Sequence, residues 1–348
     1  MIKNISWKKY LDEIDNRITI FLFYAISGSI LIGIYMVFFT SIGKDITWQS
    51  NVQLNFLLLD IIGILNAHFN VGITFVILLG IYSVIYIFCI FKPNFIFKNF
   101  RYQKLNKNSD TSPVEQPSQL SPFGQSPPFS DNNNNNYLHI IIQWFSAYFV
   151  ISIIIDQVQQ IFGIHIGTPL LNNPLLSYLN LTAAPLNEEI LFRILFLGIP
   201  LSIIIFKYKN SIISALIQPS KNLLIKSKRD KYILFIIIIT NSIFFGLSHV
   251  IFGGNYEIGK ITQASIGGLF LGWIYFRYGL MLSITFHWIS NYALFSYSLL
   301  GSKVFNIPIT NDEGNYFIMI LSAAFFIIGI LFIFRNINKY SRYLIKMK

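Results

Sequence analysis

The chain has 348 residues, of which 54% are hydrophobic, 17% aromatic and only 12% charged. Soluble globular domains carry about 25% Asp, Glu, Lys and Arg, so the composition excludes a soluble globular fold, a disordered chain and a disulfide scaffold. The apolar residues form long continuous runs, whereas a transmembrane β-barrel needs alternating segments of about 10 residues. The sequence therefore predicts an all-α, multi-pass integral membrane protein.

The formal net charge is +11, from 26 Lys and Arg against 15 Asp and Glu. In a membrane protein this excess gathers in cytoplasmic loops, where it sets topology and faces anionic lipid. The sequence contains no basic patch interleaved with aromatic residues. We therefore expect the lipid bilayer as a partner and no nucleic acid. Cys89 is the single cysteine, which excludes a disulfide within the chain.

A membrane-spanning helix needs about 20 mostly apolar residues. Eight runs meet this requirement, in chain order 18–40, 71–91, 138–160, 182–206, 232–252, 261–278, 280–300 and 316–334. A further apolar stretch at 53–65 is shorter and contains Asp60. We expect eight transmembrane helices, with an interfacial or re-entrant segment at 53–65.

Lys and Arg residues are distributed unevenly among the segments between these runs. Four lie before the first run, five between the second and third, seven between the fourth and fifth, and five after the eighth. Basic loops remain in the cytoplasm, and these four segments share one side of the membrane when the chain crosses it eight times. The pattern predicts that both termini are cytoplasmic.

Residues 101–136 interrupt the membrane pattern, because they are rich in Pro, Ser, Gln and Asn and end in five consecutive Asn. Such a composition cannot form a packed core, so we expect a disordered cytoplasmic linker. This linker separates two membrane units. We therefore expect four parts in the chain: a two-helix membrane unit (1–100), the linker (101–136), a six-helix membrane domain (137–335) and a basic cytoplasmic tail (336–348).

Three ionisable side chains lie within the fourth apolar run: Glu188, Glu189 and Arg193. An ionisable group at mid-membrane costs about 2.5–3.5 kcal/mol on insertion scales, so it is a functional candidate by default. Glu189 and Arg193 are four residues apart and can pair on one helix face, as a buried ion pair that fixes helix packing. Glu188 points to a different side of the helix and needs another partner.

Two of the five histidines, His249 and His287, lie inside apolar runs. The others are at run ends or in loops, where histidines are usually solvated: His68, His139 and His165. A lone buried histidine is usually a core residue, but two of them in the same bundle as Glu188 indicate a site. Asn291 follows His287 by four residues, so both side chains present to one helix face.

These residues form three short patterns on separate helices: Glu188-Glu189…Arg193, Phe245…His249 and His287…Asn291. In this order and inside the membrane, EExxxR, FxxxH and HxxxN resemble the motifs of the CAAX-protease and bacteriocin-processing (CPBP, or Abi) family. That family includes the type II CAAX prenyl endopeptidases. The resemblance covers about residues 140–300. It implies that 137–335 is an intramembrane protease domain with its catalytic core in spans four to seven, and that Glu189, Arg193 and Phe245 have supporting roles.

Hydrolysis of a peptide bond requires an activated water, stabilisation of the oxyanion and a proton for the leaving amine. We expect Glu188 to act as the general base, with His249 orienting the water. His287 and Asn291 are then the donors to the oxyanion, and the resemblance implies the same division of roles. The expected partner is a membrane-anchored protein or peptide substrate, prenylated if the enzyme is of the CAAX type.

A metal site is an alternative to this mechanism, because Glu188, His249 and His287 form a His₂Glu set like that of some catalytic zinc sites. The family has been described both as metalloproteases and as metal-free glutamate proteases. The sequence lacks HExxH, in which one helix supplies two histidines and the base. If Glu188 bound a metal, Glu189 would have to act as base, which pairing with Arg193 disfavours. We favour the metal-free interpretation and regard zinc as the candidate cofactor.

Straight, parallel spans would place Glu188 and His249 toward the outer side and His287 nearer the cytoplasmic side, a mismatch on the order of 10 Å. We expect a kink at Pro185 or Pro200, or a late end of the fifth span at 253–254, to remove this offset.

Two other classes of function fit the same residues. A proton-coupled transporter or channel also places Glu, His and Arg inside a helix bundle, although the chain shows no repeated halves. A non-catalytic family member that acts as a scaffold or an immunity factor is the second, although the motif set is complete.

Overall fold

The computed structural model describes residues 7–47, 71–90, 137–167, 174–205, 211–223, 225, 227–252, 256–309 and 314–347. These residues are mostly helical and contain no strand, and one isolated β-bridge pairs Gly167 with Tyr256. The predicted linker, 101–136, and the predicted interfacial stretch, 53–65, both lie outside the described residues, as does the glycine pair at 253–254.

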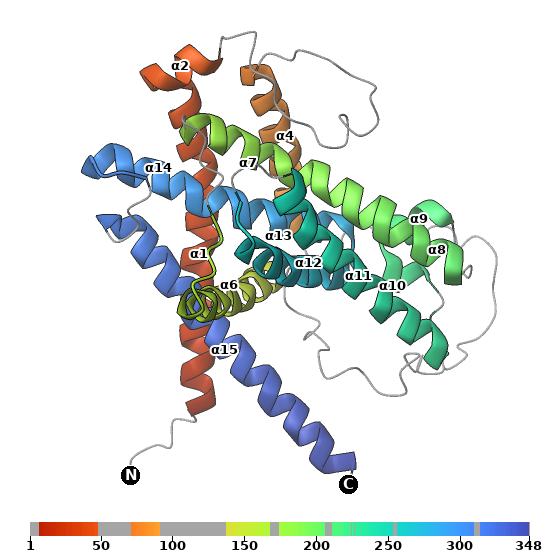
Figure 1. Ribbon diagram of the computed structural model, residues 1–348. Helices are drawn as coiled ribbons and strands as arrows, with labels where there is room; N and C mark the ends of the chain where they lie inside the picture. The colour runs from red at the N-terminus through yellow and green to blue at the C-terminus, as the bar shows by residue number, and fades with distance from the viewer. Residues whose placement is uncertain are drawn as a thin grey trace, which may run out of the picture.

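Figure 1 shows how the helices are arranged around one another. In chain order they are α1 (Trp7–Phe38), α2 (Ser41–Thr47), α4 (Val71–Ile90), α6 (Tyr137–Ile161), α7 (Pro174–Glu189), η1 (Ile190–Gly198), α8 (Ile199–Ile205), α9 (Ile212–Ile217), α10 (Pro219–Asn222), α11 (Lys228–Phe252), α12 (Gly259–Tyr278), α13 (Leu280–Trp288), η2 (Ile289–Ala293), α14 (Leu294–Phe305) and α15 (Tyr316–Met347).

Five described helices are long and apolar enough to cross a membrane: Tyr10–Phe38, Val71–Ile90, Tyr137–Ile161, Lys228–Phe252 and Tyr316–Asn338. The protein is an integral, multi-pass membrane protein. The fourth and seventh predicted spans are not among these five, because the π-helices η1 and η2 divide them into shorter elements. The sixth predicted span coincides with α12, which is continuous but contains more small and polar residues.

Helices α11 and α12 pack closely along their length. Gly268 and Gly272 of α12 lie at this contact, where a Cβ atom at Gly268 would be 3.1 Å from the Ser242 Cα atom. These two glycines, four residues apart, therefore serve helix packing within the chain, because small residues let two helix backbones approach each other.

The two N-terminal helices pack against different parts of the rest of the molecule. Both contact α6, but α1 also contacts α14, α15 and η2, whereas α4 contacts α7 and α13. Helix α1 begins and α15 ends at the same end of the molecule (Figure 1). There Arg335 of α15 bonds to Asp12 over 2.9 Å and also to Asp15. Helix α4 is thus placed beside the helices that carry the first and third motifs.

The helix that carries Glu188 and Glu189 has an irregular course. Pro185 lies inside α7, where it lacks the N–H that a regular helix would pair with the carbonyl of Leu181. A π-helix, η1, begins directly after Glu189 and contains Arg193. π-Helical turns inside α-helices are frequent at functional sites. A second one, η2, follows His287 by two residues and contains Asn291.

Candidate active site

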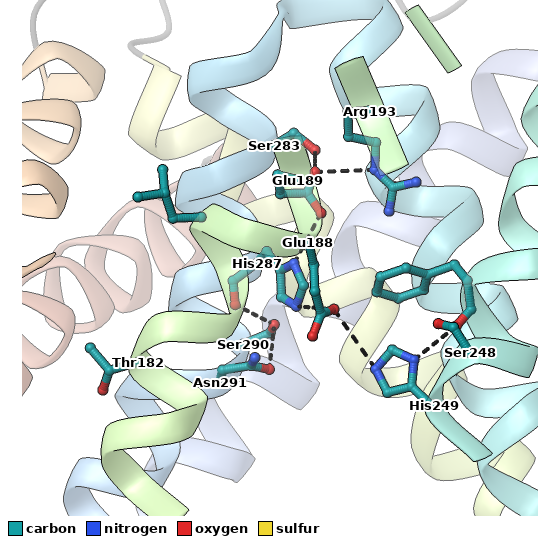
Figure 2. Close-up of polar contacts among 12 residues, drawn as sticks. Thr182, Glu188, Glu189, Arg193, Ser248, His249, Ser283, His287, Ser290 and Asn291 are labelled. Atoms are coloured by element: carbon teal, nitrogen blue, oxygen red, sulfur yellow. Dashed lines mark hydrogen bonds and ion pairs between the residues drawn. The ribbon is translucent and has the colours of Figure 1, made fainter. Parts of the chain in front are cut away.

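The three motifs meet at the Glu188 carboxylate, which lies between two imidazole rings (Figure 2). Its Oε2 atom is 3.9 Å from His249 Nε2 and 3.7 Å from His287 Nε2. The offset of about 10 Å that straight, parallel spans would give is therefore absent, and the three motifs converge. The spans are not parallel, because α7 lies across the direction of α1 (Figure 1).

Both imidazoles point the same ring atom at Glu188. His249 Nδ1 is 2.8 Å from the backbone carbonyl of Phe245, and His287 Nδ1 is 2.9 Å from Glu189 Oε1. A carbonyl oxygen only accepts hydrogen bonds, as does an ionised carboxylate, so each Nδ1 carries a proton and donates it. In a neutral ring the Nε2 atom that faces Glu188 is then an acceptor.

Glu188 Oε2 has no hydrogen-bond partner among the described residues, although it is buried. A carboxylate oxygen and two imidazole nitrogens are all acceptors when neutral rings face an ionised acid. Three converging acceptors favour a bound water or a proton between them, and separations above about 3.5 Å are typical of water-bridged groups. The geometry thus presents a place for a water that is activated by a carboxylate.

Solvent exposure separates these residues from their neighbours in the sequence. The Glu188 side chain is 19% exposed and His249 16%, whereas Glu189 and Arg193 are both 0% exposed. Glu188 and His249 can therefore meet water or substrate. Glu189 and Arg193 can act only through other protein groups.

Glu189 and Arg193 form the ion pair that their spacing predicts, with Arg193 Nε 3.1 Å from Glu189 Oε2. The pair belongs to a larger buried network, because Glu189 also accepts hydrogen bonds from Ser283 Oγ and His287 Nδ1. Arg193 Nη1 donates to Asn241 Oδ1 over 2.6 Å. Such additional bonds are what offset the cost of burying two charges. The network also sets the orientation of the His287 ring.

Phe245, the first residue of the second motif, packs among the charged and catalytic candidates. The Arg193 guanidinium carbon lies 5.1 Å from the centre of its ring, a cation–π distance. The rings of His249 and His287 contact the same phenylalanine edge to face, at 4.7 and 5.9 Å between centroids. The Phe245 ring therefore packs against both histidines and the arginine and restricts where their side chains can lie.

Asn291 lies beside His287 in Figure 2, one turn further along the chain. Its Oδ1 atom is 3.5 Å from Ser290 Oγ, the single hydrogen bond that the described residues give its side chain. This bond uses the amide oxygen as acceptor, so both N–H donors of the Asn291 amide are available to a bound group.

Of the other three histidines, the two that the structure describes lie away from this cluster in the chain. His68 lies outside the described residues. His139 is in the first turn of α6, and His165 is in the segment after α6, where its backbone carbonyl accepts a bond from the Gly259 N–H.

Sequence reasoning missed three residues that support the site: Ser283, Asn241 and Tyr82. The Tyr82 hydroxyl of α4 donates to the carbonyl of Thr182 over 2.7 Å and accepts from the Leu186 N–H over 3.2 Å. A regular α-helix pairs this carbonyl with this N–H directly. Tyr82 thus bridges these two backbone groups next to Pro185, and Leu186 is two residues before Glu188. Its ring stacks on Trp288, which is 1% exposed and therefore a packing residue.

Glu188, His249 and His287 would be the ligands of a metal on this site. Within the ranges that the structure describes, no group of three or more His, Cys, Asp or Glu side chains has an arrangement that could hold a metal ion.

Residues 170–293 match the family model described as type II CAAX prenyl endopeptidase Rce1-like. This stretch is an Rce1-like domain. It includes all three motifs, from Glu188 to Asn291, and it excludes Tyr82 and both N-terminal helices. No curated protein and no solved structure gives a significant match to the chain. The name of the Rce1-like family indicates a CAAX-type endopeptidase of the membrane. The match therefore indicates protease activity.

Proposed function

We propose that the protein hydrolyses a peptide bond of a membrane-associated substrate, with water activated by Glu188 and His249. The observation that carries this proposal is the position of Glu188 Oε2, unbonded and 3.9 and 3.7 Å from the Nε2 atoms of His249 and His287. A general base has to lie within hydrogen-bond distance of the water that it deprotonates, or be connected to it through one further water.

In the proposed reaction, Glu188 takes a proton from the bound water while the water oxygen attacks the substrate carbonyl carbon. The negative charge moves to the carbonyl oxygen, which accepts hydrogen bonds from His287 and the Asn291 amide. His287 Nδ1–H is already committed to Glu189, so it donates through a protonated Nε2, and the Glu189 carboxylate stabilises that charged ring. The C–N bond then breaks, and Glu188 returns the proton to the leaving amine, assisted by His249.

The proposed mechanism uses no metal ion. The His287–Glu189 contact resembles the carboxylate–histidine pairs that orient metal ligands, but it equally stabilises a protonated imidazole. In the metal alternative, Glu188, His249 and His287 would have to come together as ligands, and zinc would supply polarisation of the water.

We propose a prenylated protein that ends in a CAAX sequence as the substrate, since this is the class that the Rce1-like family name specifies. In such sequences the prenyl group is carried by the Cys of the C-a-a-X terminus. The lipid would hold the substrate in the bilayer beside a site built from membrane helices.

We further propose eight membrane spans with both termini in the cytoplasm, and the domain boundaries predicted above. The common position of the start of α1 and the end of α15 supports an even number of crossings (Figure 1). The divided elements from α7 to α8 and from α13 to α14 would supply the fourth and seventh spans.

The proposal is tested with purified protein in proteoliposomes and a membrane-anchored reporter peptide. Glu188→Ala and His249→Ala should each abolish cleavage, while Glu13→Gln, an exposed glutamate of α1, should leave it unchanged. Retained cleavage in both alanine variants would refute the assignment of the site. Uptake or current without cleavage would identify a transporter or channel, and the absence of all three activities would leave a scaffold or immunity function.

A further inference from the structure

Lys260 is a cationic side chain close to the site but outside the three motifs. It lies in the first turn of α12 and is partly exposed. Its Nζ atom donates to Gln263 Oε1 over 2.8 Å and lies 4.6 Å from the centre of the Tyr256 ring. Gln263 in turn donates to Ser152 Oγ over 3.1 Å, so its carbonyl oxygen is fixed toward the lysine.

Tyr256 places Lys260 on the His249 side of the site. The Tyr256 and His249 rings are 5.9 Å apart between centroids. The charge of Lys260 interacts with Glu188 and with His249. Burial raises the pKa of Tyr256 above its usual range, so the phenol stays neutral beside the ammonium. The lysine charge is therefore directed at the site and is not cancelled by its aromatic neighbour.

Hydrogen bonds hold the segment that carries Tyr256 and Lys260 against the last turn of α6 and the residues that follow it. Gly167 and Tyr256 form a β-bridge. The Glu257 N–H donates to the carbonyl of Ile166 over 3.0 Å, and Gln159 Nε2 donates to the carbonyl of Gly259 over 3.0 Å. A binding group fixed in this way loses little conformational entropy when a ligand arrives.

Lys260 retains binding capacity that the described residues do not use. An ammonium has three N–H donors, and Gln263 accepts one of them. No carboxylate among the described side chains lies within 4.0 Å of Nζ, whereas Arg193 of the first motif is paired with Glu189. An anion is the ligand that such a partly exposed, unpaired cation favours.

We propose that Lys260 binds the C-terminal carboxylate of the substrate peptide. This inference rests on the proposed function. A C-a-a-X substrate cut next to its prenylated Cys has three residues between the scissile bond and the terminal carboxylate. Three extended residues span about 10 Å, which is comparable to the two contacts that link His249 to Lys260 through Tyr256, 5.9 Å between the ring centroids and 4.6 Å from the Tyr256 ring to Nζ. The lysine then fixes the direction of the peptide and the distance of the cut from its end.

The test compares two prenylated peptides that differ only at the C-terminus, one a free acid and the other a carboxamide. Wild-type protein should cleave the free acid with kcat/KM about tenfold higher or more, because a charged hydrogen bond is lost in the amide. Lys260→Met should remove this preference by slowing only the acid, and Lys260→Arg should keep it. Lys303→Met, at an exposed lysine of α14, is the matched control.

A wild-type protein without preference, or a Lys260→Met variant that keeps it, would overturn the proposal. Cleavage of the carboxamide shows that the variant is folded. If that variant fails to fold, inhibition of the wild type decides the matter: the released tripeptide acid should inhibit more strongly than its carboxamide, and equal inhibition contradicts the proposal. Cleavage of neither peptide by the wild type would instead refute the proposed function itself, and this inference with it.

Discussion

Glu189 Oε1 accepts a hydrogen bond of 2.9 Å from His287 Nδ1. This contact joins the first motif to the third across 98 residues of sequence. It commits one nitrogen of His287 to the buried network and leaves the other facing Glu188. The second glutamate of the first motif therefore acts on the site through His287.

Glu189 and Arg193 should depend on each other for stability. Both are fully buried, and removal of one partner of a buried ion pair costs about 3–5 kcal/mol. We predict that Glu189→Gln and Arg193→Met each lower the thermal unfolding midpoint in detergent strongly, and that the double variant recovers part of the loss. Cleavage should remain lost in the double variant, because His287 no longer faces a carboxylate.

Additive losses in the double variant would show that the two charges are not energetically coupled. Recovery of cleavage together with stability would show that Glu189 acts only as a structural partner of Arg193.

Ser283 should matter for the orientation of Glu189. Its hydroxyl donates to Glu189 Oε2 and lies 3.2 Å from the carbonyl of Leu271. A hydrogen bond to a charged group contributes about 1.5–3 kcal/mol, so Ser283→Ala should lower both the unfolding midpoint and kcat, with little change in KM. Ser298→Ala, at a buried serine of α14, is the control. An effect on KM alone would place Ser283 in substrate binding instead.

Tyr82 should affect catalysis although it lies outside the Rce1-like match. Tyr82→Phe removes the hydroxyl that bonds to Thr182 and Leu186, so the helix around Pro185 loses this support and Glu188 shifts. Misplacement of a catalytic group by about 1 Å can cost a factor of about 100, and we predict a fall in kcat of about tenfold or more with KM unchanged.

Tyr86→Phe is the matched control for Tyr82→Phe, because its hydroxyl bonds to Ser27 of α1 while its ring also contacts Trp288. Equal kinetics for Tyr82→Phe and the wild type would remove Tyr82 from the positioning of Glu188.

The metal-free mechanism predicts that chelators leave the cleavage rate unchanged. Purified protein should contain no stoichiometric zinc by elemental analysis. Loss of cleavage with a chelator, restored by added zinc but not by magnesium, would show that Glu188, His249 and His287 act as ligands.

The part of the candidate site that consists of ionisable residues inside apolar runs was predictable from the sequence. Glu188, His249 and His287 are conspicuous because ionisable groups are rare inside apolar runs, and the Glu189–Arg193 pair follows from four-residue helix spacing. Ser283, Asn241 and Tyr82 are uncharged residues that are common in membrane helices, so the sequence offers no signal to separate them from packing residues.

The fold was predictable in its helical content and its long apolar helices, but less so in its irregular parts. Neither η1 nor η2 has a sequence signature, since a π-helix arises from local packing and not from the propensity of particular residues. The way in which the offset between His287 and the other motifs is removed was not predictable for the same reason, because only the packed arrangement shows that α7 lies across the direction of α1 (Figure 1). The contact of α4 with α7 is likewise set by long-range packing.

The most direct test of the account is the cleavage rate of Glu188→Gln on a prenylated CAAX peptide, with product masses read by mass spectrometry. The substitution keeps the size of the side chain, and the buried Glu189–Arg193 network does not depend on it, so the unfolding midpoint should equal that of the wild type. Loss of a general base costs a factor of about 10²–10⁴, and the account predicts a fall of that size with one cleavage site next to the prenylated Cys in the wild type. A Glu188→Gln variant that cleaves the peptide at the wild-type rate would contradict it.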